Sequence, residues 1–92
     1  MNEVSSIPAP EQPLAAQFQL FPNPTAQRVT VDFEEQARFE RMEILNLQGK
    51  VLLAQEVGRV GFEIDVSRLP VGLYLVSMIG ERGRATQKLL KQ

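Results

Sequence analysis

Several residue types that carry chemistry are missing from this chain, and each absence removes a class of function. Among the 92 residues there is no cysteine, which excludes disulfides and thiolate metal sites. There is no histidine, the commonest general base and metal ligand. With no tryptophan and one tyrosine, an aromatic platform for sugars or nucleobases is poorly supplied. The composition argues against an enzyme, and we expect no catalytic residue, cofactor or metal site.

Long apolar runs and a strong net charge are also missing. No stretch approaches the ~20 apolar residues of a membrane span, so we expect no transmembrane segment. The formal net charge is −1, which gives no reason to expect a nucleic-acid partner. Residues 1–17 lack the basic region and apolar run of a secretory signal peptide. If the domain works outside the cytoplasm, we expect its export signal on a longer parent chain.

Proline is concentrated at the start of the chain. Residues 1–17 include Pro8, Pro10 and Pro13, half of the six prolines. Each proline fixes φ and removes a backbone donor, which favours an extended segment. We predict a proline-rich flexible linker over residues 1–17, which would join a cargo to one domain over residues 18–92. A disordered tail without a linking role is the alternative.

From Phe18 onward, apolar residues recur with a period of two, which predicts strands. The expected strands cover residues 18–21, 28–34, 39–47, 50–56, 62–66, 73–79 and 84–90. Their spacing of about 8–12 residues is typical of an antiparallel β-sandwich of about seven strands. Residues 73–79 are apolar almost throughout, which favours a central strand covered on both faces. A helix over Gln36–Leu47 is the main alternative, but Met42 and Ile44 at spacing two favour a strand.

Glycine and proline mark the expected turns. Gln48-Gly49 predicts a two-residue hairpin turn, with glycine supplying the positive φ. Gly58 and Gly61 bracket another turn. Residues 67–70 predict a short turn across one end of the fold, and residues 80–83 predict a hairpin loop.

Four sequence segments then stand in a fixed order. They are Phe21-Pro22-Asn23-Pro24; residues 42–50, ending in Gly49-Lys50; residues 64–76, with Asp65, Leu69, Gly72 and Tyr74; and Lys88-Leu89-Leu90-Lys91. Together they resemble the C-terminal sorting domains of the type IX secretion system of Bacteroidota. The resemblance covers residues 20–91. Phe21, Met42 and Asn46 replace residues that are more usual in that family.

The resemblance implies an Ig-like sandwich that acts as a C-terminal secretion signal. The cargo would pass through the periplasm, and the outer-membrane type IX translocon would recognise the domain. A sortase-like surface protease would remove it, leaving the cargo at the cell surface or in the medium. Cleavage is expected before Phe18, with Ser5-Ser6 and Ala15-Ala16 as candidates. The alternative function is an Ig-like accessory or adhesion module that binds carbohydrate or protein; a homodimer stays open.

Two of the motifs have both a structural and a recognition interpretation. The Phe21-Pro22-Asn23-Pro24 segment is expected to fix the entry to the fold, with Phe21 as a core plug, or to contact the translocon. Gly49-Lys50 is either turn chemistry or a recognition element.

The third motif, by contrast, is expected to be structural. Asp65 should face solvent or bond the backbone at Ser67. Gly72 should allow close backbone approach, and Tyr74 should be packed with its hydroxyl at an edge. Leu69 belongs to the same structural motif.

The terminal segment Lys88-Leu89-Leu90-Lys91 is the strongest candidate for recognition. A last strand is easily an edge strand, whose unpaired N–H and C=O groups another sheet could extend. The two leucines should place an apolar group on both faces. The alternative is an ordinary last strand with one leucine in the core and lysines that discourage aggregation.

Overall fold

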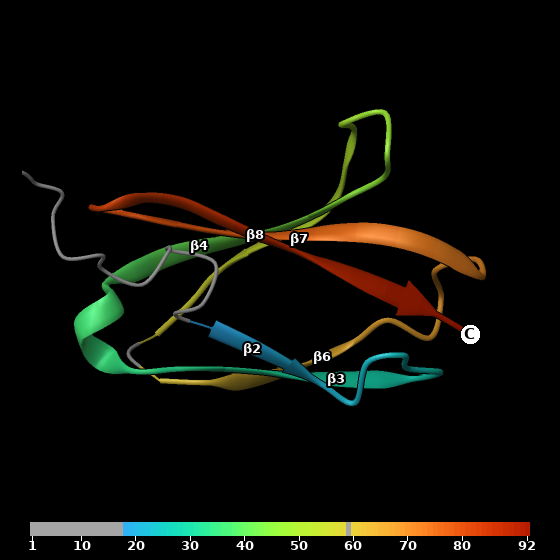
Figure 1. Cartoon of the computed structure of the whole chain (residues 1–92), viewed down its shortest axis with the longest axis horizontal. Helices are drawn as coiled ribbons and strands as arrows, with labels where there is room; N and C mark the ends of the chain where they lie inside the picture. The colour runs from blue at the N-terminus through green and yellow to red at the C-terminus, as the bar shows by residue number, and fades with distance from the viewer. Residues whose placement is uncertain (1–17, 59) are drawn as a thin grey trace, which may run out of the picture.

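The computed structural model describes residues 18–58 and 60–92, which form two antiparallel sheets packed face to face. The three-stranded sheet has the order β2 (Phe18–Phe21), β3 (Arg28–Phe33) and β6 (Phe62–Asp65). The four-stranded sheet has the order β5 (Val51–Glu56), β4 (Phe39–Leu45), β7 (Gly72–Gly80) and β8 (Gly83–Lys91). Figure 1 shows the two layers, with the β4–β5 hairpin projecting beyond them. The predicted all-β sandwich is confirmed. The predicted linker lies outside the described residues.

The core lies between the sheets and follows the predicted alternation. In β3, Val29 and Val31 are fully buried while Arg28 and Asp32 are exposed. In β8, Ala85 and Leu89 point inward, and Leu90 points outward. Burying one valine or leucine side chain contributes about 1.5–3 kcal/mol to the stability of the fold.

Aromatic rings fill one end of this core. Phe39 makes edge-to-face contacts with Phe18 and Phe33, with ring centroids 5.9 and 5.5 Å apart. Phe33 also contacts Phe62 at 6.3 Å. Each such aromatic pair contributes about 0.5–1.5 kcal/mol to stability, in addition to the contribution of its buried area.

The expected core plug, Phe21, is not in the core. Phe21 is 46% exposed, whereas Phe18 is 1% exposed. In the β2–β3 ladder Phe18 lies opposite Phe33, and Phe21 lies opposite Thr30. Since side chains alternate across a strand, Phe18 and Phe21 must face opposite sides. The prediction chose the wrong one of the two phenylalanines.

The segment before β4 contains one short helical turn. A 3₁₀ turn spans Glu35–Ala37, and Arg38 follows with φ 59°. The strand Phe39–Leu45 then confirms the strand interpretation against the helical alternative. A bulge in the β4–β7 ladder lies between Phe39 and Arg41. The extra residue places buried Phe39 and Met42 three apart, which is why the sequence partly imitates a helix.

Strand β7 is central, but only one of its faces is covered by the other sheet. Tyr74, Val76 and Met78 are buried in the core. On the opposite face Leu73 is 37% exposed and Leu75 is half-buried. The prediction of a strand covered on both faces is therefore wrong. In the described part of the chain, its outward leucines stay partly exposed.

Candidate recognition surface

The Pro-Asn-Pro segment runs along the outer edge of β8. The side-chain amide of Asn23 donates to the Lys88 carbonyl at 2.9 Å. The main-chain N–H of Leu90 donates to the Asn23 Oδ1 atom at 3.0 Å. An asparagine side chain offers a donor and an acceptor, so it can bond a strand edge as another backbone would. The two flanking X-Pro bonds are cis.

Thr25 continues this pairing with its backbone. Its N–H donates to the Leu90 carbonyl at 2.9 Å, and its carbonyl accepts the Gln92 N–H at 2.7 Å. Its hydroxyl donates to the Arg28 carbonyl at 2.6 Å, and the residue is 2% exposed. Asn23 and Thr25 together form what we call the edge cap of β8.

The edge cap corrects the prediction of an unpaired terminal strand. β8 is an edge strand, as predicted. However, the outward main-chain groups near Lys88, Leu90 and Gln92 are bonded to Asn23 and Thr25. By alternation the outward groups of Arg84 and Thr86 lie on the same edge, where no described strand pairs with them.

The Gly49-Lys50 motif belongs to a turn that is longer than predicted. The N–H of Gly49 donates to the Asn46 carbonyl at 3.0 Å, and the N–H of Asn46 donates to the Lys50 carbonyl at 3.0 Å. Gly49 has φ 90°, as expected for its positive-φ role. The loop therefore extends over Asn46–Lys50, not over Gln48-Gly49 alone.

Asn46 organises this loop and was not singled out as a functional or structural residue. Its Oδ1 accepts the N–H groups of Gln48 at 3.0 Å and Lys50 at 2.9 Å. Asparagine commonly bonds the backbone two residues on, so its position before the turn was the available signal.

Asp65 and Tyr74 stabilise the connection from β6 to β7. The Asp65 Oδ1 accepts the Ser67 N–H at 2.8 Å. The hydrogen bonds from Ser67, assisted by Arg28 and Arg68, lower the pKa of this exposed carboxyl below its ordinary value of 3.8. Tyr74 is buried, and its hydroxyl donates to the Pro70 carbonyl. The bond of Asp65 to the Ser67 backbone and the packing of Tyr74 agree with the prediction.

Leu69 and Gly72 complete that connection. Leu69 packs against the core, and its N–H donates to the Val66 carbonyl at 3.0 Å. A Cβ at Gly72 would meet nothing within 4 Å, so the predicted close approach is wrong there. Glycine is favoured at this position by its φ of 156°.

These local arrangements occur in a chain whose motifs match a known family. The profile of the secretion-system C-terminal sorting domain matches residues 19–92. The chain belongs to this family. The predicted resemblance is confirmed, and the domain is a type IX C-terminal sorting signal. No curated protein matches the chain.

Membership of the sorting-domain family sets the direction of transport and the class of partner. It implies export toward the cell surface or the extracellular space, type IX machinery as the partner, and a cargo on the N-terminal side. Within the described residues, no helix is long and apolar enough to cross a membrane.

The fold of the sorting domain brings its separated motifs onto one surface. Across the four-stranded sheet, Val51 pairs with Leu45, Leu45 with Leu75, and Leu75 with Lys88. These side chains share the face that points away from the core. Lys50 precedes Val51, so the Gly49-Lys50 motif lies at the β5 edge of this sheet and the Lys88-Leu90 motif lies at its β8 edge.

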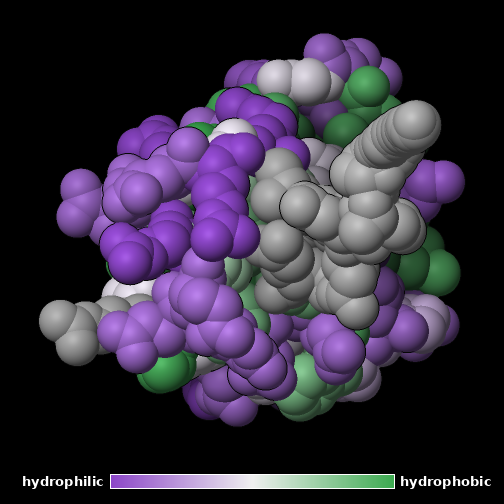
Figure 2. Space-filling model, turned by 60° about the vertical axis from the view of Figure 1, so that its left-hand side comes forward, coloured by the Kyte–Doolittle hydropathy of each residue, from purple (hydrophilic) through white to green (hydrophobic). Residues whose placement is uncertain are grey.

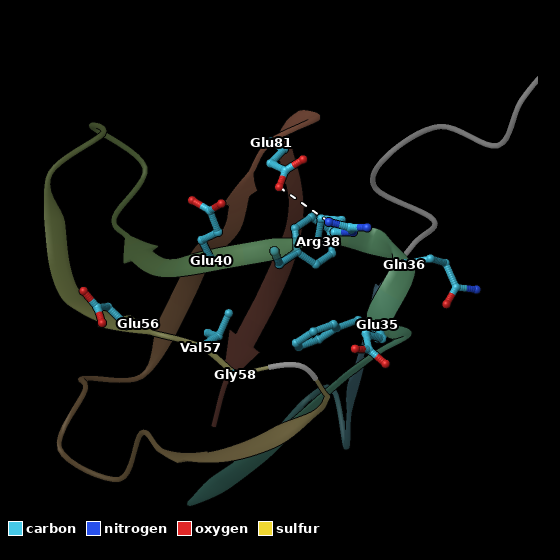
Figure 3. A pocket seen from close by; sticks show the side chains of 10 residues that line it. Glu35, Gln36, Arg38, Glu40, Glu56, Val57, Gly58 and Glu81 are labelled. Carbon is cyan, nitrogen blue, oxygen red and sulfur yellow. Dashed lines mark ion pairs between the residues drawn. The ribbon is translucent and has the colours of Figure 1, made fainter.

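A hollow lined partly by acidic residues lies where β3 ends and β4 begins. Its volume is about 820 Å³, with Phe33, Phe39 and Val57 among its apolar lining. Figure 3 shows side chains of Glu40, Glu56 and Glu81 around it, and the Arg38–Glu81 ion pair of 3.7 Å. Figure 2 shows mostly hydrophilic side chains on this end of the domain. In the described part of the chain, no group of acidic side chains is arranged to hold a metal ion.

Proposed function

We propose that residues 18–92 form an Ig-like sorting domain that the type IX outer-membrane translocon recognises in the periplasm of a member of the Bacteroidota. The cargo then reaches the cell surface or the medium. A sortase-like surface protease removes the domain by cutting within residues 1–17. The domain itself performs no catalysis in this scheme.

The observation that supports the scheme best is the contact between the two ends of the domain. Asn23 and Thr25 bond the main chain of residues 88–92, so the first and last motifs form a single unit. Phe21 and Leu90 remain exposed beside this unit. A receptor that contacts the unit would therefore meet both motifs only when the domain has folded.

Two further features support an Ig-like arrangement. The seven described strands divide three and four between two antiparallel sheets. The Tyr74 hydroxyl bonds the backbone four residues upstream, as in the tyrosine corner of Ig domains.

The test is export of a reporter. A periplasm-targeted fluorescent protein is fused in front of residues 1–92 in a bacterium with a working type IX system, and its amount in the medium and on the cell surface is measured. The matched control carries residues 1–17 only. We expect the full fusion to leave the periplasm with the domain removed, and the control to stay. Retention of a folded full fusion would overturn the proposal and favour the accessory binding module.

A further inference from the structure

Aliphatic side chains form a continuous stripe on the outward face of the four-stranded sheet. The ladders place Leu45 beside Val51 and Leu75, and Leu73 beside Leu90. Val51, Leu73 and Leu90 are 43%, 37% and 40% exposed. Leu45 and Leu75 are half-buried between them. We call these five residues the outer apolar stripe. A contiguous apolar surface of this kind is a mark of an interaction site.

Two lysines lie near the stripe: Lys88 is on β8, on the same face, and Lys50 is in the loop directly before β5. Lys88 lies opposite Leu75, and Lys50 precedes Val51. Neither lysine forms an ion pair within the described residues. At the other end of the same face, Arg41 and Arg84 share Glu43 at 3.2 and 3.4 Å. At that end of the face each arginine therefore has a carboxylate within reach, whereas Lys88, beside the leucines, has none within the described residues.

We propose that the outer apolar stripe docks against an apolar protein surface that carries carboxylate groups, on the machinery that recognises the sorting domain. This inference rests on the proposed function and names the face that is contacted. The carboxylates would meet Lys50 and Lys88, while the apolar surface covers the leucines. Complementary charge at the rim and apolar contact at the centre is the usual anatomy of such interfaces.

Charge decides against a second copy of the chain as the occupant. Two copies packed through this face would bring Lys88 of each copy toward the stripe of the other, with Lys50 at the margin. The five residues of the stripe are all apolar, so they offer no acid to meet them. Like charges brought together at an interface are costly.

The composition of the stripe also decides against a membrane surface. Electrostatic binding to anionic lipid takes clusters of about 4–8 basic residues. Interfacial anchoring further favours tryptophan and tyrosine, and neither occurs in the stripe.

The test uses the reporter fusion with substitutions at exposed positions of the stripe. Leu73→Ser and Leu90→Ser remove apolar contact, and the pair Lys50→Glu with Lys88→Glu reverses the charge. Val60→Ser and Arg82→Glu are matched controls, since both residues are exposed and lie elsewhere. Circular dichroism melting of each purified fusion separates misfolding from lost recognition.

We expect each stripe variant to lower export roughly tenfold at an unchanged melting temperature, and the controls to match wild type. If folded stripe variants are exported as well as wild type, the docking role of the stripe is overturned, while the proposed function stays intact. Retention of the unsubstituted fusion would instead overturn the proposed function.

Two binding measurements on the purified fusion test the other occupants, a second copy of the chain and a membrane surface. Sedimentation showing a dimer that Leu73→Ser abolishes, or flotation with anionic phosphatidylglycerol vesicles that it abolishes, would also overturn the proposal.

Discussion

The side-chain oxygen of Asn23 accepts the main-chain N–H of Leu90 at 3.0 Å, although the two residues are 67 positions apart in the chain. The same side chain donates to the Lys88 carbonyl. A polar side chain thus takes the place that a neighbouring strand would occupy at the edge of β8. Unprotected edges invite pairing with other chains, so this bond both joins the ends of the domain and blocks an adhesive edge.

Asn23→Ala should destabilise the domain and open that edge. The change removes both side-chain bonds to β8, and with exposed groups we expect a loss of about 1 kcal/mol in the free energy of unfolding. Urea denaturation measures this loss, and sedimentation should show more self-association. Gln19→Ala is the control, since Gln19 is an exposed residue of β2 without a described side-chain bond. Equal stability and equal association of the two variants would contradict the edge cap.

Gly80→Ala should destabilise the domain strongly, although it adds only one methyl group. A Cβ at position 80 would collide with the Arg38 carbonyl oxygen and lie 2.9 Å from the carbonyl carbon. Backbone atoms cannot swing away as a flexible side chain can, so we expect a loss of about 1–3 kcal/mol in the free energy of unfolding. At Gly58 a Cβ would meet nothing within 4 Å. Gly58→Ala should therefore unfold at the wild-type urea concentration, and a similar midpoint for both variants would rule out the clash.

Asp65 should make stability depend on acid pH. Hydrogen bonds from Ser67 lower its pKa in the folded state below 3.8, so the charged form is favoured by folding. A lowered folded pKa gives stability that is fully present above the unfolded pKa and is lost as the pH falls through the folded value. Urea unfolding of wild type and Asp65→Asn between pH 2 and pH 6 measures this contribution. The stability difference between the two proteins should change only below about pH 4; a difference independent of pH would contradict the Ser67 contact.

Local patterns predicted most of the strands, and the failures have identifiable causes. The alternation of Val29, Val31 and Phe33 fixed which face of β3 is buried. In β2 the sequence FQLF has an aromatic residue on each face, so alternation alone does not decide between Phe18 and Phe21. The bulge before Arg41 inserts a residue that no local pattern announces.

The recognition surface was less predictable, because it depends on contacts far apart in sequence. The bond from Asn23 to Lys88 joins residues 65 positions apart. No local property of a Pro-Asn-Pro segment indicates which strand it will border. Likewise, the position of Leu45 beside Leu75 follows from strand order and register, which only the folded sheet reveals. The family resemblance named the motifs, and the structure supplied their arrangement.

The two phenylalanines of β2 allow folding and recognition to be separated. Phe18 is 1% exposed and contacts Phe39, so Phe18→Ala should cost about 3–5 kcal/mol in the free energy of unfolding. Phe21 is 46% exposed at the start of the Pro-Asn-Pro segment, and Phe21→Ala should change stability by about 0.5 kcal/mol or less. Urea denaturation measures both changes.

If the translocon contacts this segment, Phe21→Ala should still lower export of the reporter fusion, because the lost contact lies on the receptor side. Such a folded but retained variant would show that Phe21 acts in recognition. Normal export of Phe21→Ala would instead indicate that the Pro-Asn-Pro segment acts only through its hydrogen bonds to β8. Comparison with Asn23→Ala then tells whether the edge cap itself is needed, since that variant keeps Phe21 but loses the contact with Leu90. If Asn23→Ala is retained and Phe21→Ala is exported, the translocon recognises the Pro-Asn-Pro segment joined to β8 and not the ring of Phe21.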